Sequence, residues 1–135
     1  MRPLSMRPLK IFTVTAVIGA SAFGAAFAQH HGGADVLAGY EKTGDVVTCL
    51  PLTQVRDSDP VDDNAILFEL RNGDMYLNEL RGQCIGLMRN DRYSYKTTQN
   101  QICSGDILTV ANPVGTPVGS CGLGAFEALS KISTD

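Results

Sequence analysis

The clearest pattern of hydrophobic and polar positions in the chain lies between residues 61 and 84. Two runs rich in strand-forming residues, AILFEL at 65–70 and MYLNEL at 75–80, flank the dipeptide Asn72-Gly73. This dipeptide tolerates positive φ at both central positions of a type I′ turn. The pattern therefore predicts a β-hairpin with a two-residue loop.

A two-residue loop also predicts the register of the hairpin, because it sets Phe68 opposite Leu77. One face then carries five apolar side chains: Ile66, Phe68, Leu70, Met75 and Leu77. The other face mixes polar and apolar residues and includes Tyr76 and Asn78. We expect the first face to be buried and the second to face solvent.

Outside the hairpin the chain shows further short strand patterns and almost no helix. Strands are expected at 45–55, 92–97, 106–111 and 121–129, and about two helical turns at 34–42. Loops are expected at 56–64, 81–90 and 112–120. Gly122 and Gly124 mark a close backbone approach or a bend in the last strand. The predicted class is all-β: a small antiparallel barrel or sandwich of five to six short strands.

The N-terminal pattern is typical of a secretory signal peptide. Residues 1–10 contain three basic residues and no acidic one, residues 11–27 carry no charge, and Ala26-Phe27-Ala28 supplies small residues at a cleavage site. An uncleaved anchor is disfavoured because the uncharged run is barely long enough to span a bilayer. We expect a periplasmic or secreted protein that begins at Gln29.

These patterns predict four parts of the chain: a signal peptide at 1–28, a flexible or partly helical segment at 29–44, a β-domain at 45–129 and a tail at 130–135. No later segment predicts a membrane span. Without residues 1–28 the chain has 8 basic and 14 acidic residues, a net charge of −6. This balance argues against nucleic acid as a partner, since nucleic acid requires a basic surface.

Four cysteines, an even number in a small exported chain, indicate two disulfides. The alternative, a zinc site of four thiolates, lacks a C-x-x-C pair and has intervening lengths of 34, 18 and 17 residues. Of the three possible pairings we favour Cys84 with Cys103 and Cys49 with Cys121, because the first and last strands of a closed meander are neighbours.

Six short motifs occur in order along the chain: VDD at 61–63, ILF at 66–68, YLNEL at 76–80, CIGL at 84–87, CSGDI at 103–107 and CGLGAF at 121–126. Together they resemble a family of small exported bacterial proteins known only as a domain of unknown function. The resemblance covers residues 49–126 and implies an exported, cysteine-containing domain. It brings no catalytic residue and no cofactor.

Histidine occurs only at His30 and His31, beside the expected cleavage site. The β-domain therefore lacks an imidazole for a general base or a nucleophile system. Cleavage after Ala28 would make His31 the third residue behind a free amine, an arrangement that suits Cu(II). Cyclisation of Gln29 would remove that amine, and a polar tail without metal is the default interpretation.

Acidic residues are the other candidates for a functional site. Asp57, Asp59, Asp62 and Asp63, with Asn64, place five oxygen-bearing side chains within eight residues. Calcium requires such oxygens, although the spacing is not that of an EF-hand. Two of these carboxylates are also a candidate acid/base pair for a glycan hydrolase. The plain alternative is a solvated loop in which Asp and Asn side chains cap turns.

The leading functional hypothesis is a non-enzymatic binding or structural domain that acts on an unidentified protein or envelope component. Tyr76, Tyr93 and Tyr95 are the candidate contact residues, since tyrosine combines apolar area with a polar tip. Their alternative role is aromatic packing across strands. The metal-binding module and the glycan hydrolase are the competing hypotheses.

Overall fold

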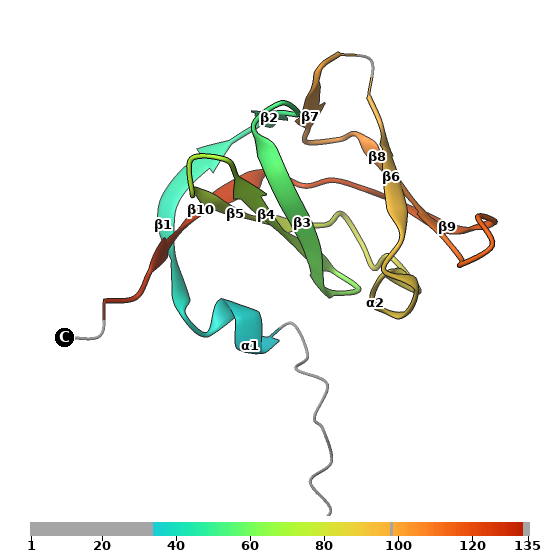
Figure 1. Cartoon of the computed structure of the whole chain (residues 1–135), viewed down its shortest axis with the longest axis horizontal. Coiled ribbons are helices and arrows are strands. Elements are labelled where there is room, and N and C mark those ends of the chain that lie inside the picture. The colour runs from blue at the N-terminus through green and yellow to red at the C-terminus, as the bar shows by residue number, and fades with distance from the viewer. Residues whose placement is uncertain (1–33, 98, 134–135) are drawn as a thin grey trace, which may run out of the picture.

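The computed structural model describes residues 34–97 and 99–133, and antiparallel strands dominate this part of the chain (Figure 1). The elements in chain order are α1 (Ala34–Leu37), β1 (Tyr40–Val47), β2 (Cys49–Pro51), β3 (Val55–Asp62), β4 (Ala65–Leu70), β5 (Met75–Glu79), α2 (Leu87–Asn90), β6 (Tyr93–Lys96), β7 (Gln101–Cys103), β8 (Ile107–Ala111), β9 (Pro117–Gly122) and β10 (Phe126–Lys131). The predicted antiparallel all-β class with two disulfides is confirmed. The described residues form ten strands, more than the five or six expected.

The strands form three sheets that curve around a shared interior (Figure 1). The largest has the order β1-β10-β5-β4-β3, the second has the order β6-β8-β9, and β2 pairs with β7 alone. The pairing of β1 with β10 joins the first strand to the last. β3 and β6 are edge strands of two different sheets.

Two segments that the sequence predicts as loops are strands. β3 occupies most of the charged segment 56–64, and β9 begins at Pro117 inside the segment 112–120. Charged residues and proline are common on edge strands because they hinder pairing with other chains. An edge strand that is polar on both faces therefore resembles a loop in sequence. Residues 40–44, assigned to the flexible segment, also belong to a strand, β1.

The β4–β5 hairpin has a three-residue loop, so the predicted register is wrong by one residue. The Gly73 N–H donates to the Leu70 carbonyl at 2.9 Å, and the Leu70 N–H donates to the Asp74 carbonyl at 2.8 Å. Gly73 has φ 92°, but Asn72 is not among the described residues with positive φ. This geometry is a type I turn followed by a glycine bulge, which excludes the type I′ turn.

The register shift reverses the faces of β5. Phe68 lies opposite Tyr76 instead of Leu77, because a slip of one residue moves every side chain to the other face. Tyr76 and Asn78 therefore point into the main core, while Leu77 packs on the opposite face of the sheet. β4 is buried on both faces, so its hydrophobic run is nearly continuous.

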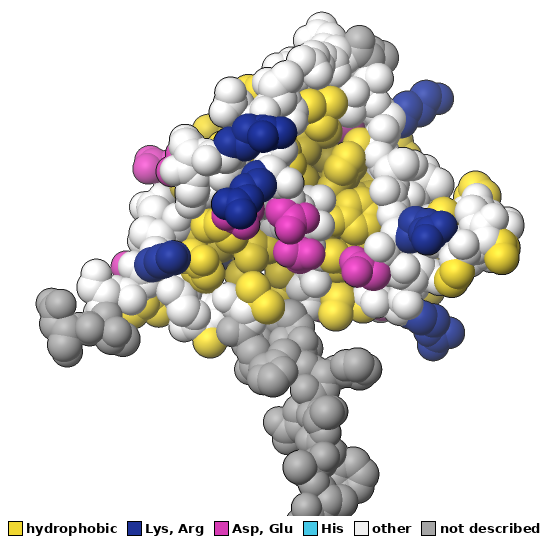
Figure 2. Space-filling view, in the orientation of Figure 1, with side chains coloured by type: hydrophobic (Ala, Val, Ile, Leu, Met, Phe, Trp, Pro, Cys, Tyr) yellow, Lys and Arg dark blue, Asp and Glu magenta, His cyan; other side chains and the backbone are white. Residues whose placement is uncertain are grey.

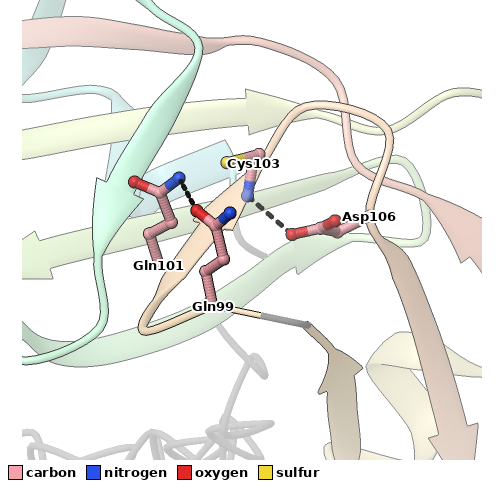
Figure 3. Close-up of a pocket in the computed structure, with 4 residues that line it drawn as sticks. All are labelled: Gln99, Gln101, Cys103 and Asp106. Atoms are coloured by element: carbon pink, nitrogen blue, oxygen red, sulfur yellow. Dashed lines mark hydrogen bonds between the residues drawn. The ribbon is translucent and has the colours of Figure 1, made fainter.

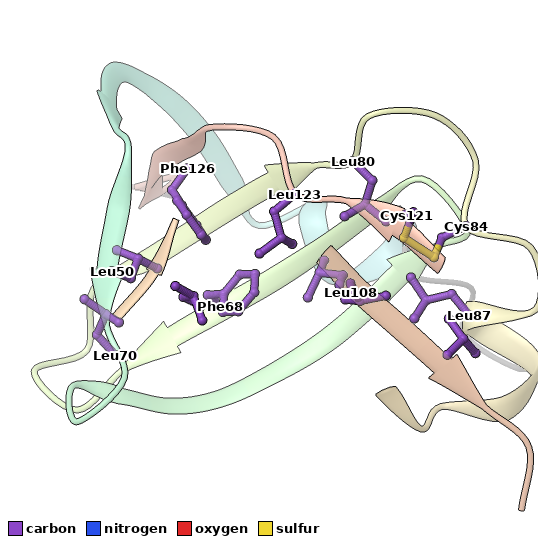
Figure 4. Packing of buried hydrophobic residues seen from close by; sticks show 13 residues of the cluster. Leu50, Phe68, Leu70, Leu80, Cys84, Leu87, Leu108, Cys121, Leu123 and Phe126 are labelled. Carbon is purple, nitrogen blue, oxygen red and sulfur yellow. A yellow bond between two sulfur atoms is a disulfide. The ribbon is translucent and has the colours of Figure 1, made fainter. Parts of the chain in front are cut away.

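The main core lies between the three sheets (Figure 4). Phe68 and Phe126 meet edge to face with ring centroids 5.3 Å apart, and β2, β7 and β8 contribute Leu50, Ile102 and Leu108. A second cluster covers the outer face of the large sheet: Val61, Ala65, Leu67 and Leu77. Leu37 of α1 packs against that cluster.

The disulfides join Cys49 to Cys103 and Cys84 to Cys121, so the predicted pairing is wrong. The first and last strands do pair, as expected, but no cysteine lies on either of them. Cys49 lies in β2 directly opposite Cys103 of β7. Cys121 lies in β9. An isolated backbone β-bridge between Arg81 and Gly122 brings the segment that carries Cys84 beside β9.

Candidate functional site

The candidate site lies where the edges of β3 and β6 face each other without forming a ladder. Side chains connect them: the Tyr93 hydroxyl donates to the Ser58 carbonyl and lies 2.9 Å from Ser58 Oγ. The Tyr95 hydroxyl donates to Ser58 Oγ at 3.3 Å. Figure 2 shows hydrophobic side chains gathered between the two strands. We call this region, with Ser58, Tyr93 and Tyr95, the open side.

The two tyrosines of the open side are half-buried, although as candidate contact residues they were expected to face outward. They alternate with the exposed residues Ser94 and Lys96 and pack against the main core. Tyr95 lies 6.0 Å from Phe68 and 5.6 Å from Tyr93 between ring centroids. Burial raises the pKa of both hydroxyls. Aromatic packing along β6 and against Phe68 of the large sheet therefore holds the rings, and part of each remains accessible.

Carboxylates gather beside the open side. Burial raises the pKa of Asp59, and repulsion from Asp57, Asp91 and Glu69 raises it further. Arg56 approaches Glu69 at 3.3 Å between Nη1 and Oε1. Among the described residues no salt bridge engages Asp59. The surroundings of Asp59, on the β3 border of the open side, therefore have an excess of negative charge.

Asp59→Asn is expected to stabilise the domain slightly at neutral pH, by less than about 0.5 kcal/mol. Because folding raises the pKa of Asp59, its contribution to stability is fully present below 3.8, the unperturbed value, and is lost as pH rises through the folded pKa. The gain in free energy of unfolding from Asp59→Asn should therefore shrink towards zero in acid. Urea unfolding at pH 3 and pH 7 measures it, with Asp45→Asn on β1 as the control. A gain equal at both pH values would contradict the prediction.

The other carboxylates of segment 57–64 cap backbone amides. Asp57 Oδ1 accepts a hydrogen bond from Ser58 N at 2.8 Å, Asp62 Oδ1 from Asn64 N at 2.6 Å, and Asp63 Oδ1 from Met88 N at 3.0 Å. In residues 34–97 and 99–133, no three His, Cys, Asp or Glu side chains gather as a metal site requires. This arrangement matches the plain alternative of capping side chains. His31 lies outside the described residues.

Asp63→Ala is expected to lower the free energy of unfolding by about 1 kcal/mol, because it leaves the Met88 amide without its acceptor. Asp63→Asn keeps an acceptor oxygen at the same place and should cost clearly less. Urea unfolding of both variants measures the difference. Equal losses would show that the hydrogen bond to Met88 contributes nothing.

A second candidate is a polar pocket of about 230 Å³ beside the Cys49–Cys103 disulfide, lined by Gln99, Gln101, Cys103 and Asp106 (Figure 3). Gln101 Nε2 donates to Gln99 Oε1 at 3.0 Å, and the Cys103 N–H donates to Asp106 Oδ2 at 2.8 Å. These polar groups are thus largely engaged with one another. Cys103 is in a disulfide, so it offers no thiolate to this pocket.

Sequence reasoning missed Ser58 and the two glutamines. Ser58 becomes notable only because β3 and β6, 35 residues apart along the chain, face each other. The glutamines show no local pattern that distinguishes them from other polar surface residues. Tyr93 and Tyr95 were predicted and do lie together, whereas Tyr76 lies on β5 in another sheet.

Comparison with known proteins does not identify a function for this site. Within the described residues, no helix is both long enough and apolar enough to cross a membrane. No family model, no curated protein and no solved structure matches the chain. The resemblance to an exported family of unknown function therefore stays a prediction.

Proposed function

We propose that this chain is a non-enzymatic, exported binding domain that contacts a protein or envelope component through its open side. The observation that carries the proposal is the accessible apolar and tyrosine surface between two unpaired sheet edges, bordered by carboxylates. Export is supported by the signal-peptide pattern and by two disulfides, which persist in oxidising compartments.

The chemistry of the open side suits a macromolecular contact. Half-buried tyrosines supply large, rigid contact area at a low cost in conformational entropy. The repulsion among Asp57, Asp59 and Asp91 would be relieved by a cationic group. The open side therefore favours a partner that is apolar at its centre and basic at its border.

Site-specific photocrosslinking in the native host tests this assignment. A photoreactive phenylalanine replaces Ser94, which is exposed on β6 between the two tyrosines. The matched control replaces Ser120, which is exposed at the far edge of the same sheet. We expect one defined adduct from position 94, none from position 120, and loss of the adduct in Asp59→Lys. Equal labelling from both positions, or none from either, would refute the proposal.

Export has its own test. The intact mass of the protein from the periplasm of its host should start at Gln29 or its cyclised form, with no alkylation before reduction. A mass that retains residues 1–28, or four thiols that alkylate at once, would contradict export.

A further inference from the structure

We infer that the partner contributes an extended segment that pairs with the free edge of β6, with apolar and basic residues alternating along it. This inference rests on the proposed function and names the kind of partner that the open side fits. It follows from the direction of the backbone groups on β6 and β3. It follows also from the side chains on the two faces of the gap, which is the space between the facing edges of these strands.

The outer edge of β6 has backbone groups available for pairing. The Ala111 N–H donates to the Arg92 carbonyl at 2.9 Å, and Tyr93 lies opposite Val110 in the β6–β8 ladder. Because hydrogen-bonded and non-hydrogen-bonded pairs alternate in an antiparallel ladder, Ser94 bonds to β8 while Tyr93 and Tyr95 direct their N–H and C=O groups away from it. These two residues therefore present donors and acceptors spaced as an added strand requires.

The facing edge of β3 is already capped. The Ser58 N–H donates to Asp57 Oδ1 at 2.8 Å, and its carbonyl accepts the Tyr93 hydroxyl. The next outward position is Pro60, which has no N–H. Capped amides and proline are ways in which proteins block edge pairing. Strand addition is therefore directed to β6.

The two faces of the gap differ in chemistry. Tyr93 and Tyr95 lie on the inner face, against the main core. Asp57 and Asp59 alternate with the inward-facing Ser58, so they lie on the outer face. Since side chains of an added strand alternate between faces, its apolar residues would meet the tyrosines and its basic residues the carboxylates.

A second copy of this chain fits the edge less well than a basic segment does. In a second copy the other edge of β6 is already paired with β8, so pairing β6 with β6 would also have to bring that β8 into the space in front of β3. A free segment carries no such neighbour, and the carboxylates of Asp57 and Asp59 favour a basic one. We therefore commit to a separate, basic partner segment.

The probe is a capped peptide of alternating valine and lysine, about eight residues long, which matches the length of natural strands. Amide hydrogen exchange of the full protein is followed residue by residue with and without peptide. Exchange at Tyr93 and Tyr95 should slow at least about tenfold, because their amides become hydrogen-bonded. Ser94 and Lys96, already in the β8 ladder, should change little.

Two altered peptides separate backbone pairing from side-chain contact. N-methylation of alternate amides removes the donors on one edge of the peptide, so one of the two methylation patterns should abolish the slowed exchange while the other retains it. A valine and glutamate peptide should bind at least about tenfold more weakly than the lysine form, and Asp59→Asn should weaken the lysine form while Asp45→Asn should not.

Several results would overturn the inference. Binding without slower exchange at Tyr93 and Tyr95 would leave the open side as a contact surface but exclude strand pairing. Slower exchange at β9 instead, dimer formation through β6, or no binding of the lysine peptide would refute the assigned partner. Failure of the proposed function is distinct, because it would appear as loss of the position-specific crosslink.

Discussion

Gly124→Ala is expected to destabilise the domain by about 3 kcal/mol. A Cβ atom at this position would overlap the carbonyl oxygen of Glu79, which belongs to the backbone and cannot rotate away. To relieve this overlap, the segment between β9 and β10 must move away from the end of β5. Urea unfolding measures the loss.

Gly122→Ala is the matched control. Its Cβ would meet only the Arg81 side chain, at 3.7 Å, an ordinary van der Waals contact. It should change the free energy of unfolding by less than about 0.5 kcal/mol. Equal effects of the two alanine variants would show that the close approach at Gly124 is not what constrains this turn.

Asn78 holds the backbone of Gly124 in place through two hydrogen bonds. Asn78 is fully buried, its Nδ2 donates to the Gly124 carbonyl at 2.8 Å, and its Oδ1 accepts from the Gly124 N–H at 2.9 Å. Asn78→Ala leaves both backbone groups without a partner and should cost about 2–4 kcal/mol. Because both substitutions break one junction, the double variant should lose less than the sum of the single losses.

Removing the Cys84–Cys121 disulfide by paired alanine substitution is expected to cost about 2–4 kcal/mol. The bridge joins residues 37 apart in sequence, so its loss frees a long loop in the unfolded chain. Both sulfurs are also buried in the main core, and their removal leaves space there. At the scale of this domain each 1 kcal/mol lowers Tm by about 4–8 °C.

The paired alanine variant of Cys49 and Cys103 is the comparison. These cysteines are only half-buried, so their loss should carry the chain-entropy cost with a smaller cavity cost. Thermal unfolding of both variants ranks the two bridges. If the Cys49–Cys103 variant loses more, or neither loses stability, burial of Cys84 and Cys121 is not what decides their contribution.

The sequence contained the information that depends on local chemistry. Strand-forming runs predict the antiparallel class, and an even number of cysteines behind a signal-peptide pattern predicts two disulfides. Gly122 and Gly124 were predicted to mark a close backbone approach or a bend, and the contact between Gly124 and the Glu79 carbonyl confirms a close approach at Gly124. In each case the prediction depends on the residue types themselves and not on which distant residues they contact.

Features that depend on distant parts of the chain were predicted wrongly or not at all. One residue more in the β4–β5 loop moved Tyr76 and Asn78 into the core, because strand side chains alternate with a period of two. Asn-Gly is compatible with both loop lengths, so packing selected the register. The segment that forms β3 was predicted as a loop because both of its faces are largely polar. An edge strand does not need a hydrophobic face.

By itself, the sequence determined that this chain forms a small antiparallel β-domain with two disulfides, because composition and local strand propensity suffice for both. Only the tertiary structure decided which cysteines pair and that Ser58 joins the two tyrosines at the candidate site. Those contacts join residues 35 to 54 positions apart. Their formation depends on which sheet edges the folded chain brings together, and no local pattern encodes that choice.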